Sequence, residues 1–169
     1  MTTLYLARHG ETIDNANKIM QGQTQGRLTD NGRKQAAELA DRLSAVHLDA
    51  IISSDLRRAI DTASTVAAPR GLAVTTTPLL RERDWGSFTG RYIPSLKGEA
   101  WPDDIESLER LHARAADFLS FVKQNFDGKT VLAVGHGIIN KAIQAVHFGK
   151  QMNEIARMEN AEVRVLHID

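Results

Sequence analysis

The sequence contains no cysteine and no excess of charge of either sign. Its 169 residues include 21 Lys and Arg and 21 Asp and Glu, so the formal net charge at pH 7 is zero. The absence of cysteine excludes disulfides and thiolate metal sites. The balanced charge argues against a general basic face, and we therefore expect no nucleic-acid partner.

Long apolar runs are also missing. No stretch approaches the roughly 20 apolar residues that a membrane-spanning helix needs. The first residues lack the basic and apolar regions of a signal peptide, so we expect no membrane partner and a cytoplasmic location. The length predicts a single domain, residues 1–169, that is large enough to bury its own core. The sequence leaves the oligomeric state open.

Apolar runs alternate with amphipathic segments, a pattern typical of α/β proteins. The predicted strands are residues 3–7, 49–53, 72–77, 130–134 and 163–167, and the predicted helices are residues 30–43, 55–67, 108–122 and 137–147. We therefore expect a three-layer sandwich with a mostly parallel central sheet flanked by helices. Residues 79–104 lack periodicity and contain both tryptophans, which predicts a long loop. Loops of that length in compact domains are usually functional.

Several chemically distinctive residues follow predicted strands. They are Arg8 and His9 after the first strand, the pair Arg57-Arg58 after the second, Glu82 after the third, and His136 after the fourth. Segments that follow parallel strands converge on one edge of an open α/β sheet, where ligands bind. The sequence therefore predicts that these side chains gather at one site.

The surrounding sequences form an ordered series of motifs from residue 4 to about residue 140. The segments are Arg8–Thr12 with Asn15, Gln21-Gly22, Leu28–Gly32 with Gln35-Ala36, Ser53–Ala59 with Thr62-Ala63, Glu82–Gly86, Glu106-Ser107 with Arg114, and Val134–Gly137. This series resembles the histidine phosphatase superfamily, the family of cofactor-dependent phosphoglycerate mutases and related phosphatases. The resemblance implies a phosphoglycerate mutase-like fold.

The resemblance also implies a phosphomonoesterase that forms a phosphohistidine intermediate on His9. A neutral imidazole suits this attack, because the phosphoryl oxygens repel an anionic nucleophile. Arg8 and Arg58 would hold the phosphoryl oxygens, since guanidinium presents paired donors that match them. His136 would donate a further hydrogen bond. Glu82 is the expected general acid, and then the base for the water that releases phosphate.

Further contacts to phosphate or substrate are expected from a second set of residues. By their positions in the motifs these are Asn15, Gln21, Gly22 and Gly137. Backbone N–H groups at the start of the helix after His136 would add to the anion site. Metal-binding spacings such as His-Glu-x-x-His are absent, so we expect neither a metal nor another cofactor.

Family membership leaves the reaction and the substrate open. Mutases of this family carry a long insertion after the third motif, with an arginine pair and a lysine for the substrate carboxylate. Here Glu82 and His136 are only 136 − 82 = 54 positions apart, and the lysine position falls on Ile93. This favours a phosphatase over the alternative, a cofactor-dependent phosphoglycerate mutase.

The short cap at about residues 83–105 is the expected specificity loop. It would suit a small phosphorylated substrate, and it also leaves room for a phosphoprotein, as in a protein phosphohistidine phosphatase. A phosphate-dependent binding domain, the non-enzymatic alternative, would lack one of the catalytic groups. All of those groups are present in this chain.

Overall fold

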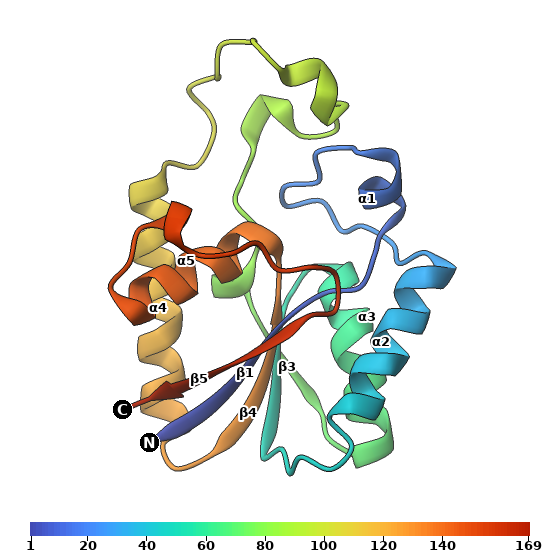
Figure 1. Ribbon diagram of the computed structural model, residues 1–169, viewed down its shortest axis with the longest axis vertical. Coiled ribbons are helices and arrows are strands. Elements are labelled where there is room, and N and C mark those ends of the chain that lie inside the picture. The colour runs from blue at the N-terminus through green and yellow to red at the C-terminus, as the bar shows by residue number, and fades with distance from the viewer.

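The computed structural model describes residues 1–169, which form a central sheet between two layers of helices (Figure 1). The strands are β1 (Thr2–Arg8), β2 (Ala50–Ser54), β3 (Val74–Thr77), β4 (Thr130–Gly135) and β5 (Val163–Ile168). The helices are α1 (Ile13–Asn17), α2 (Asp30–Arg42), α3 (Arg57–Ala67), α4 (Leu108–Asn125) and α5 (Gly137–Phe148). None of these helices is both long and apolar enough to cross a membrane.

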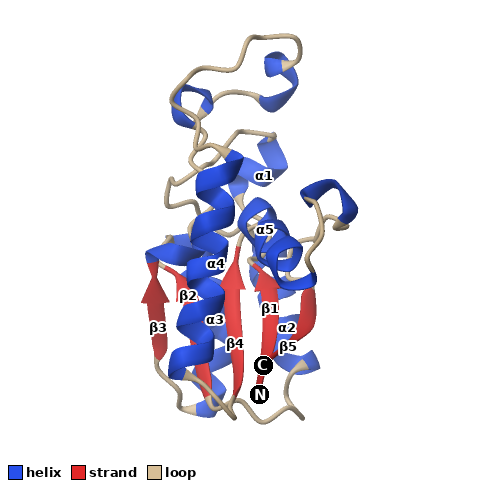
Figure 2. Ribbon diagram, turned by 90° about the vertical axis from the view of Figure 1, so that its left-hand side faces the viewer, coloured by secondary structure: helices blue, strands red, loops and turns tan.

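The five strands lie in the order β3-β2-β4-β1-β5 (Figure 2). Strands β1 to β4 are parallel to one another, and β5 pairs with β1 in the antiparallel direction at the edge. The mostly parallel sheet predicted from the sequence is therefore confirmed. Because β4 lies between β2 and β1, the carboxyl ends of these three strands are adjacent, although they are far apart in the sequence.

Two apolar clusters fill the space between the sheet and the helices. Helices α4 and α5 cover one face, and α2 and α3 cover the other (Figure 1). Along β4, Val131 and Ala133 point to the first cluster, whereas Leu132 and Val134 point to the second. A strand that is buried on both faces has no polar side, which explains the continuous apolar run in its sequence.

The helix ends show how local sequence sets the element bounds. The Oγ1 atom of Thr29 accepts the Gly32 N–H at 2.9 Å and caps α2 as predicted. Helix α3 begins at Arg57, two residues later than predicted. The chain stays extended at Leu56, whose N–H donates to Ser54 Oγ at 3.2 Å. This turn separates the end of β2 from Arg58.

Residues 83–105 form a cap beyond the carboxyl edge of the sheet, at the end of the molecule opposite both termini (Figure 2). The cap contains short 3₁₀ turns and no strand. Its backbone pairs with the loop after α1: the Met20 N–H donates to the Arg91 carbonyl at 2.9 Å, and the Ile93 N–H donates to the Lys18 carbonyl at 2.8 Å. The two segments together enclose the space above the sheet.

Candidate active site

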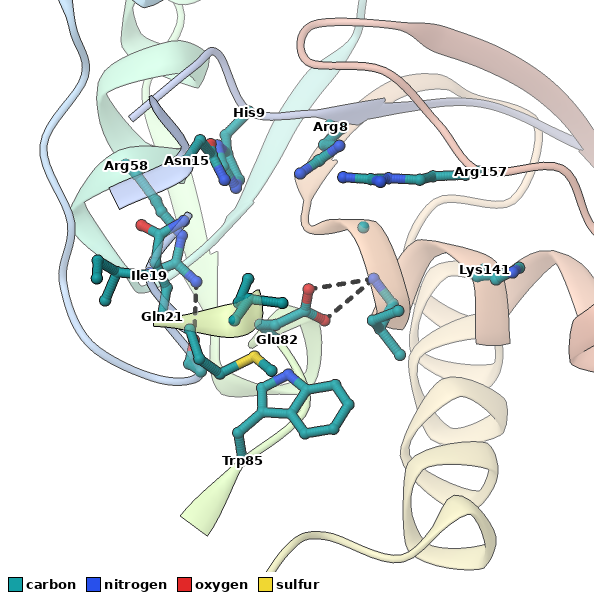
Figure 3. Close-up of a pocket in the computed structure, with 15 residues that line it drawn as sticks. Arg8, His9, Asn15, Ile19, Gln21, Arg58, Glu82, Trp85, Lys141 and Arg157 are labelled. Carbon is teal, nitrogen blue, oxygen red and sulfur yellow. Dashed lines mark hydrogen bonds between the residues drawn. The ribbon is translucent and has the colours of Figure 1, made fainter. Parts of the chain in front are cut away.

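A cavity of about 270 Å³ lies between the carboxyl edge of the sheet and the cap (Figure 3). Every residue predicted for the site lines this cavity except His136. These lining residues are Arg8, His9, Asn15, Gln21, Gly22, Arg58, Glu82 and Gly137. The structure therefore brings together residues from β1, α1, α3, α5 and three loops at one edge.

His9 follows β1 directly, and only 2% of its surface is exposed. Its Nδ1 lies 2.7 Å from the Gly10 carbonyl oxygen. A carbonyl can only accept a hydrogen bond, so Nδ1 carries the proton and Nε2 carries the lone pair. Burial, followed by the charges of Arg58 and Arg8, holds the pKa of His9 well below its usual range. The imidazole is therefore neutral and has its basic nitrogen free.

The backbone at His9 is fixed from three directions. The Gly10 N–H donates to Thr62 Oγ1 at 3.1 Å, and Asn160 Nδ2 donates to the His9 carbonyl at 3.2 Å. Gly10 also lies directly against the start of α2, where a Cβ atom would stand 2.5 Å from the Gly32 carbonyl oxygen. Any larger residue would separate these segments, so glycine at this position holds the imidazole in place.

Arg58 is 1% exposed, and it forms part of the cavity wall. It donates from Nε to His136 at 3.2 Å, from one terminal nitrogen to the Gly22 carbonyl at 2.7 Å, and from the other to the Thr24 carbonyl. These bonds use three of the five guanidinium N–H groups, and two remain for a ligand. Burial lowers the pKa of Arg58 to about 10, which leaves it charged at neutral pH.

His136 differs in placement from the sequence-based expectation of a direct donor to the phosphoryl group. It is fully buried and is absent from the cavity wall. Its Nδ1 accepts from Arg58, so Nε2 carries the proton and donates to Ser54 Oγ at 2.9 Å. Burial, followed by the charge of Arg58, holds its pKa well below the usual range. In this structure His136 contacts the site through the arginine.

Arg8, the last residue of β1, is 6% exposed and has one hydrogen bond, from Nη1 to the Met158 carbonyl at 2.8 Å. Its Nε is buried without a partner. A buried charged donor without an acceptor is costly, and an anionic ligand would remove that cost. The guanidinium packs beside Gly137, where a Cβ atom would lie 3.5 Å from Nε.

Glu82 reaches the cavity from the loop after β3 (Figure 3). Its carboxylate accepts hydrogen bonds from the backbone N–H groups of Ile138 and Ile139, at 3.0 to 3.2 Å. It thereby accepts two backbone N–H groups of the first turn of α5 that have no acceptor within the helix. These bonds fix the direction of the carboxyl group at the wall opposite Arg58.

The two amides predicted as minor contacts each have one end engaged. Asn15 Oδ1 accepts from the Thr12 N–H at 3.1 Å, and Gln21 Oε1 accepts from Thr12 Oγ1 at 3.0 Å. Their NH₂ groups donate to no other residue, and both side chains line the cavity. Thr12 therefore orients both amides so that donors remain for a ligand.

Sequence reasoning missed two cations in the cavity wall and one buried hydroxyl. Lys141 and Arg157 line the cavity, and Ser54 supports His136 from the end of β2. Ser54 stands in a recognised motif, which could have suggested its role. Lys141 and Arg157 belong to no motif, and only the packing of α5 and of the segment before β5 places them there.

Comparisons with known proteins agree with the geometry. The family model of the histidine phosphatase superfamily (branch 1) matches residues 4–169. A probable phosphoglycerate mutase GpmB from Enterobacter sp. (strain 638) is 35% identical over 152 residues, which cover 82% of this chain and 71% of the relative. The metal-independent phosphoserine phosphatase of Arabidopsis thaliana is 34% identical over 188 aligned positions, covering 99% of this chain and 77% of the relative.

A solved structure shows the same fold. A mycobacterial glucosyl-3-phosphoglycerate phosphatase, solved with VO3, has a TM-score of 0.91 and 28% sequence identity to this chain. The match covers 98% of this chain and 92% of that structure. The chain is thus similar both to proteins named as phosphatases and to proteins named as probable mutases.

Proposed function

The chain belongs to the histidine phosphatase superfamily, and from this we propose that it hydrolyses a small phosphate monoester through a phosphohistidine at His9. One observation carries the proposal: a neutral imidazole with a free Nε2 lines a cavity between two buried guanidinium groups. A neutral nucleophile beside fixed cations is what attack on an anionic phosphoryl group requires.

In the first step, His9 Nε2 attacks phosphorus, and the bond between phosphorus and the ester oxygen breaks. Glu82, as a carboxylic acid, gives its proton to the departing oxygen and becomes a carboxylate. Arg8 and Arg58 hold the equatorial oxygens, on which charge accumulates in the transition state. His136 keeps Arg58 in position by accepting its Nε–H.

In the second step, Glu82 takes a proton from water as the water oxygen attacks phosphorus. The phosphorus–nitrogen bond breaks, inorganic phosphate leaves, and His9 returns to its neutral form. The free NH₂ groups of Asn15 and Gln21 would donate to the phosphoryl oxygens in both steps.

Hydrolase activity has more support than mutase activity. Ile93, at the position that corresponds to the mutase lysine, lines the cavity with an apolar side chain. Between Arg91 and Arg110 the only cation is Lys97, so the cap lacks the arginine pair of a mutase. The name of the GpmB relative keeps the mutase as the second candidate.

A small metabolite is a better substrate than a phosphoprotein, because the cap pairs with residues 18–20 and leaves only about 270 Å³ beneath it. The relatives named for phosphoserine and glucosyl-3-phosphoglycerate support the same class.

We also propose that residues 1–169 act as one domain, with residues 83–105 as its specificity cap, and that the protein works in the cytoplasm.

Hydrolysis of p-nitrophenyl phosphate by a His9→Ala variant tests the proposal. The wild type should release phosphate, and the variant should lose at least 1,000-fold in kcat, on the order of a lost nucleophile. His47→Ala, a change at an exposed histidine, serves as the matched control and should keep wild-type kcat. Turnover in His9→Ala comparable to the wild type, with unchanged folding by circular dichroism, would exclude His9 as the nucleophile.

A further inference from the structure

Arg157 is an unpaired cation in the wall of the cavity. It lies in the segment before β5, and its side chain makes no hydrogen bond or ion pair; only its carbonyl is engaged, by Arg164. Figure 3 shows its guanidinium beside that of Arg8. Burial and then the charge of Arg157 lower the pKa of Arg8, as two neighbouring cations would.

The cavity as a whole has more positive charge than a phosphoryl group needs. Its charged lining residues are the cations Arg8, Arg58, Lys141 and Arg157 and a single acidic residue, Glu82. In the proposed first step Glu82 is protonated and the imidazole is neutral, so the wall then has four positive charges. A phosphoryl dianion neutralises two of them. The remaining positive charge can accept a second anionic group of the substrate.

We propose, on the basis of the proposed function, that the substrate is a small phosphate monoester with a carboxylate, and that Arg157 binds this carboxylate. A guanidinium presents two parallel N–H groups that match the two oxygens of a carboxylate. Lys141, one turn along α5 from Gly137, adds a second positive charge to the same cavity. A carboxylate therefore meets positive charge that the phosphoryl group leaves unneutralised.

The recognition differs from that expected for the mutase alternative. There the cations for the substrate carboxylate come from the insertion after the third motif. Here the cap supplies Ile93 to the cavity, and the cation comes from the segment before β5. Arg8 then lies between the two anionic groups, where its buried, unpartnered Nε gains an acceptor.

Competition against p-nitrophenyl phosphate hydrolysis measures the preference directly. The probes are two pairs that differ in a carboxylate: 3-phosphoglycerate with glycerol 3-phosphate, and phosphoserine with phosphoethanolamine. For the wild type, the inhibition constant of at least one acid should be about 10- to 100-fold lower than that of its partner. This range is the fold-change expected for a charge-assisted hydrogen bond.

The same measurement on Arg157→Met tests whether Arg157 binds the carboxylate. For each pair, the inhibition constant of the compound without a carboxylate is divided by that of the acid. A general effect on phosphate binding cancels in this ratio. The ratio should fall to within about threefold of one, and Arg157→Lys should recover part of it. Arg110→Met, on the exposed first turn of α4, is the matched control and should keep the wild-type ratio.

The inference is overturned if neither acid is preferred by the wild type, or if Arg157→Met keeps the wild-type preference. Either result leaves the proposed function intact as long as p-nitrophenyl phosphate is hydrolysed. Failure of the wild type to hydrolyse p-nitrophenyl phosphate, in contrast, would contradict the proposed function itself.

Discussion

Two uncharged imidazoles, those of His9 and His136, lie among buried guanidinium groups. The combination of neutral imidazoles with fixed positive charges determines the chemistry of the site. His9 and His136 have ring centroids 5.0 Å apart, yet their hydrogen bonds give them opposite tautomers. In His9 the proton is on Nδ1 and the lone pair is on Nε2; in His136 the order is reversed. One imidazole is thereby free to attack, while the other holds an arginine.

The role of Glu82 as general acid leads to a prediction on leaving groups. Glu82→Gln keeps an oxygen that can accept from the α5 N–H groups but has no proton to transfer. For an alkyl phosphate, kcat should fall by about 100-fold or more, since general acid catalysis contributes on that order. For p-nitrophenyl phosphate, whose leaving group needs no proton, the decrease should stay below about tenfold.

The matched control for this substitution is Glu109→Gln, on the exposed start of α4. It should change kcat for neither substrate. Equal losses of kcat for the alkyl and aryl esters in Glu82→Gln would contradict the assignment of a proton donor.

At the scale of elements, the sheet order explains how distant residues meet. The carboxyl ends of β1, β2 and β4 carry His9, Ser54 and His136, and β4 lies between the other two strands. Helix α3 then supplies Arg58, and the first turn of α5 receives Glu82. The site therefore depends on the register of three parallel strands and on two helix starts.

Helix α4 also orders the loop that carries Glu82. Arg114 donates to both carboxylate oxygens of Glu106, at 3.1 and 2.8 Å, and to the carbonyls of Leu79 and Arg81. Both side chains are largely buried, with 16% and 13% exposed. The pair therefore fastens the start of the cap to α4.

Arg114→Met should destabilise the protein by about 2–3 kcal/mol, because it removes the cation that pairs with the largely buried Glu106 and the donor to the Leu79 and Arg81 carbonyls. Urea unfolding measures this change, and kcat should fall as Glu82 loses its fixed backbone. Arg33→Met, at an exposed pair with Asp30, should cost less than about 0.5 kcal/mol. A similar cost for both substitutions would contradict the structural role of Arg114.

The sequence predicts an element accurately where neighbouring residues carry a recognisable pattern, such as an apolar run or a helix cap. The strand 130–134 and the Thr29 cap have strong local patterns, and the structure confirms both. Helix α3 begins two residues later than the sequence predicts, because the hydrogen bond from the Leu56 N–H to the Ser54 hydroxyl, which accompanies the extended backbone at Leu56, has no signature in the local sequence.

The same limit applies to the site. Residues in motifs could be proposed from the sequence, and eight of the nine line the cavity, as the structure shows. Arg157 and Lys141 could not be proposed, since no motif marks them and their place depends on tertiary packing. His136 contacts the site only through Arg58. This contact requires the tautomer in which His136 Nδ1 accepts a hydrogen bond, and only the surrounding hydrogen bonds identify that tautomer.

At the scale of the whole molecule, a chain with no net charge concentrates positive charge in one cavity. The 21 basic and 21 acidic residues cancel overall, whereas the cavity wall has four cations and one carboxylate. A field of this kind attracts an anionic substrate to the carboxyl edge of the sheet without making the surface generally basic.

Burial of two neutral histidines makes the stability of the fold depend on pH. The pKa values of His9 and His136 are lowered by folding, so the unfolded chain binds more protons below its own histidine pKa of about 6.5. The free energy of unfolding should therefore decrease as pH falls from 6.5 to 5, by up to about 1.4 kcal/mol per pH unit for each histidine.

Urea unfolding at pH 7.5, 6 and 5 measures this dependence. His136→Gln should reduce the slope by about a third to a half, because His9 and the partly buried His147, whose pKa burial also lowers, keep their contributions. The carboxylates with lowered pKa values lose their contribution only at more acidic pH, so they do not mask the effect. A constant free energy of unfolding between pH 7 and 5 would contradict the burial of neutral imidazoles.

The central claim is that His9 carries the phosphoryl group between the ester and water. Rapid acid-free quenching of the wild type with a ³²P-labelled phosphate ester, followed by peptide mapping, tests this claim most directly. We predict an acid-labile, base-stable label on the peptide that contains His9, present within the first turnover and absent in His9→Ala. Steady release of phosphate with no label on His9 at any time within the first turnover would contradict the account.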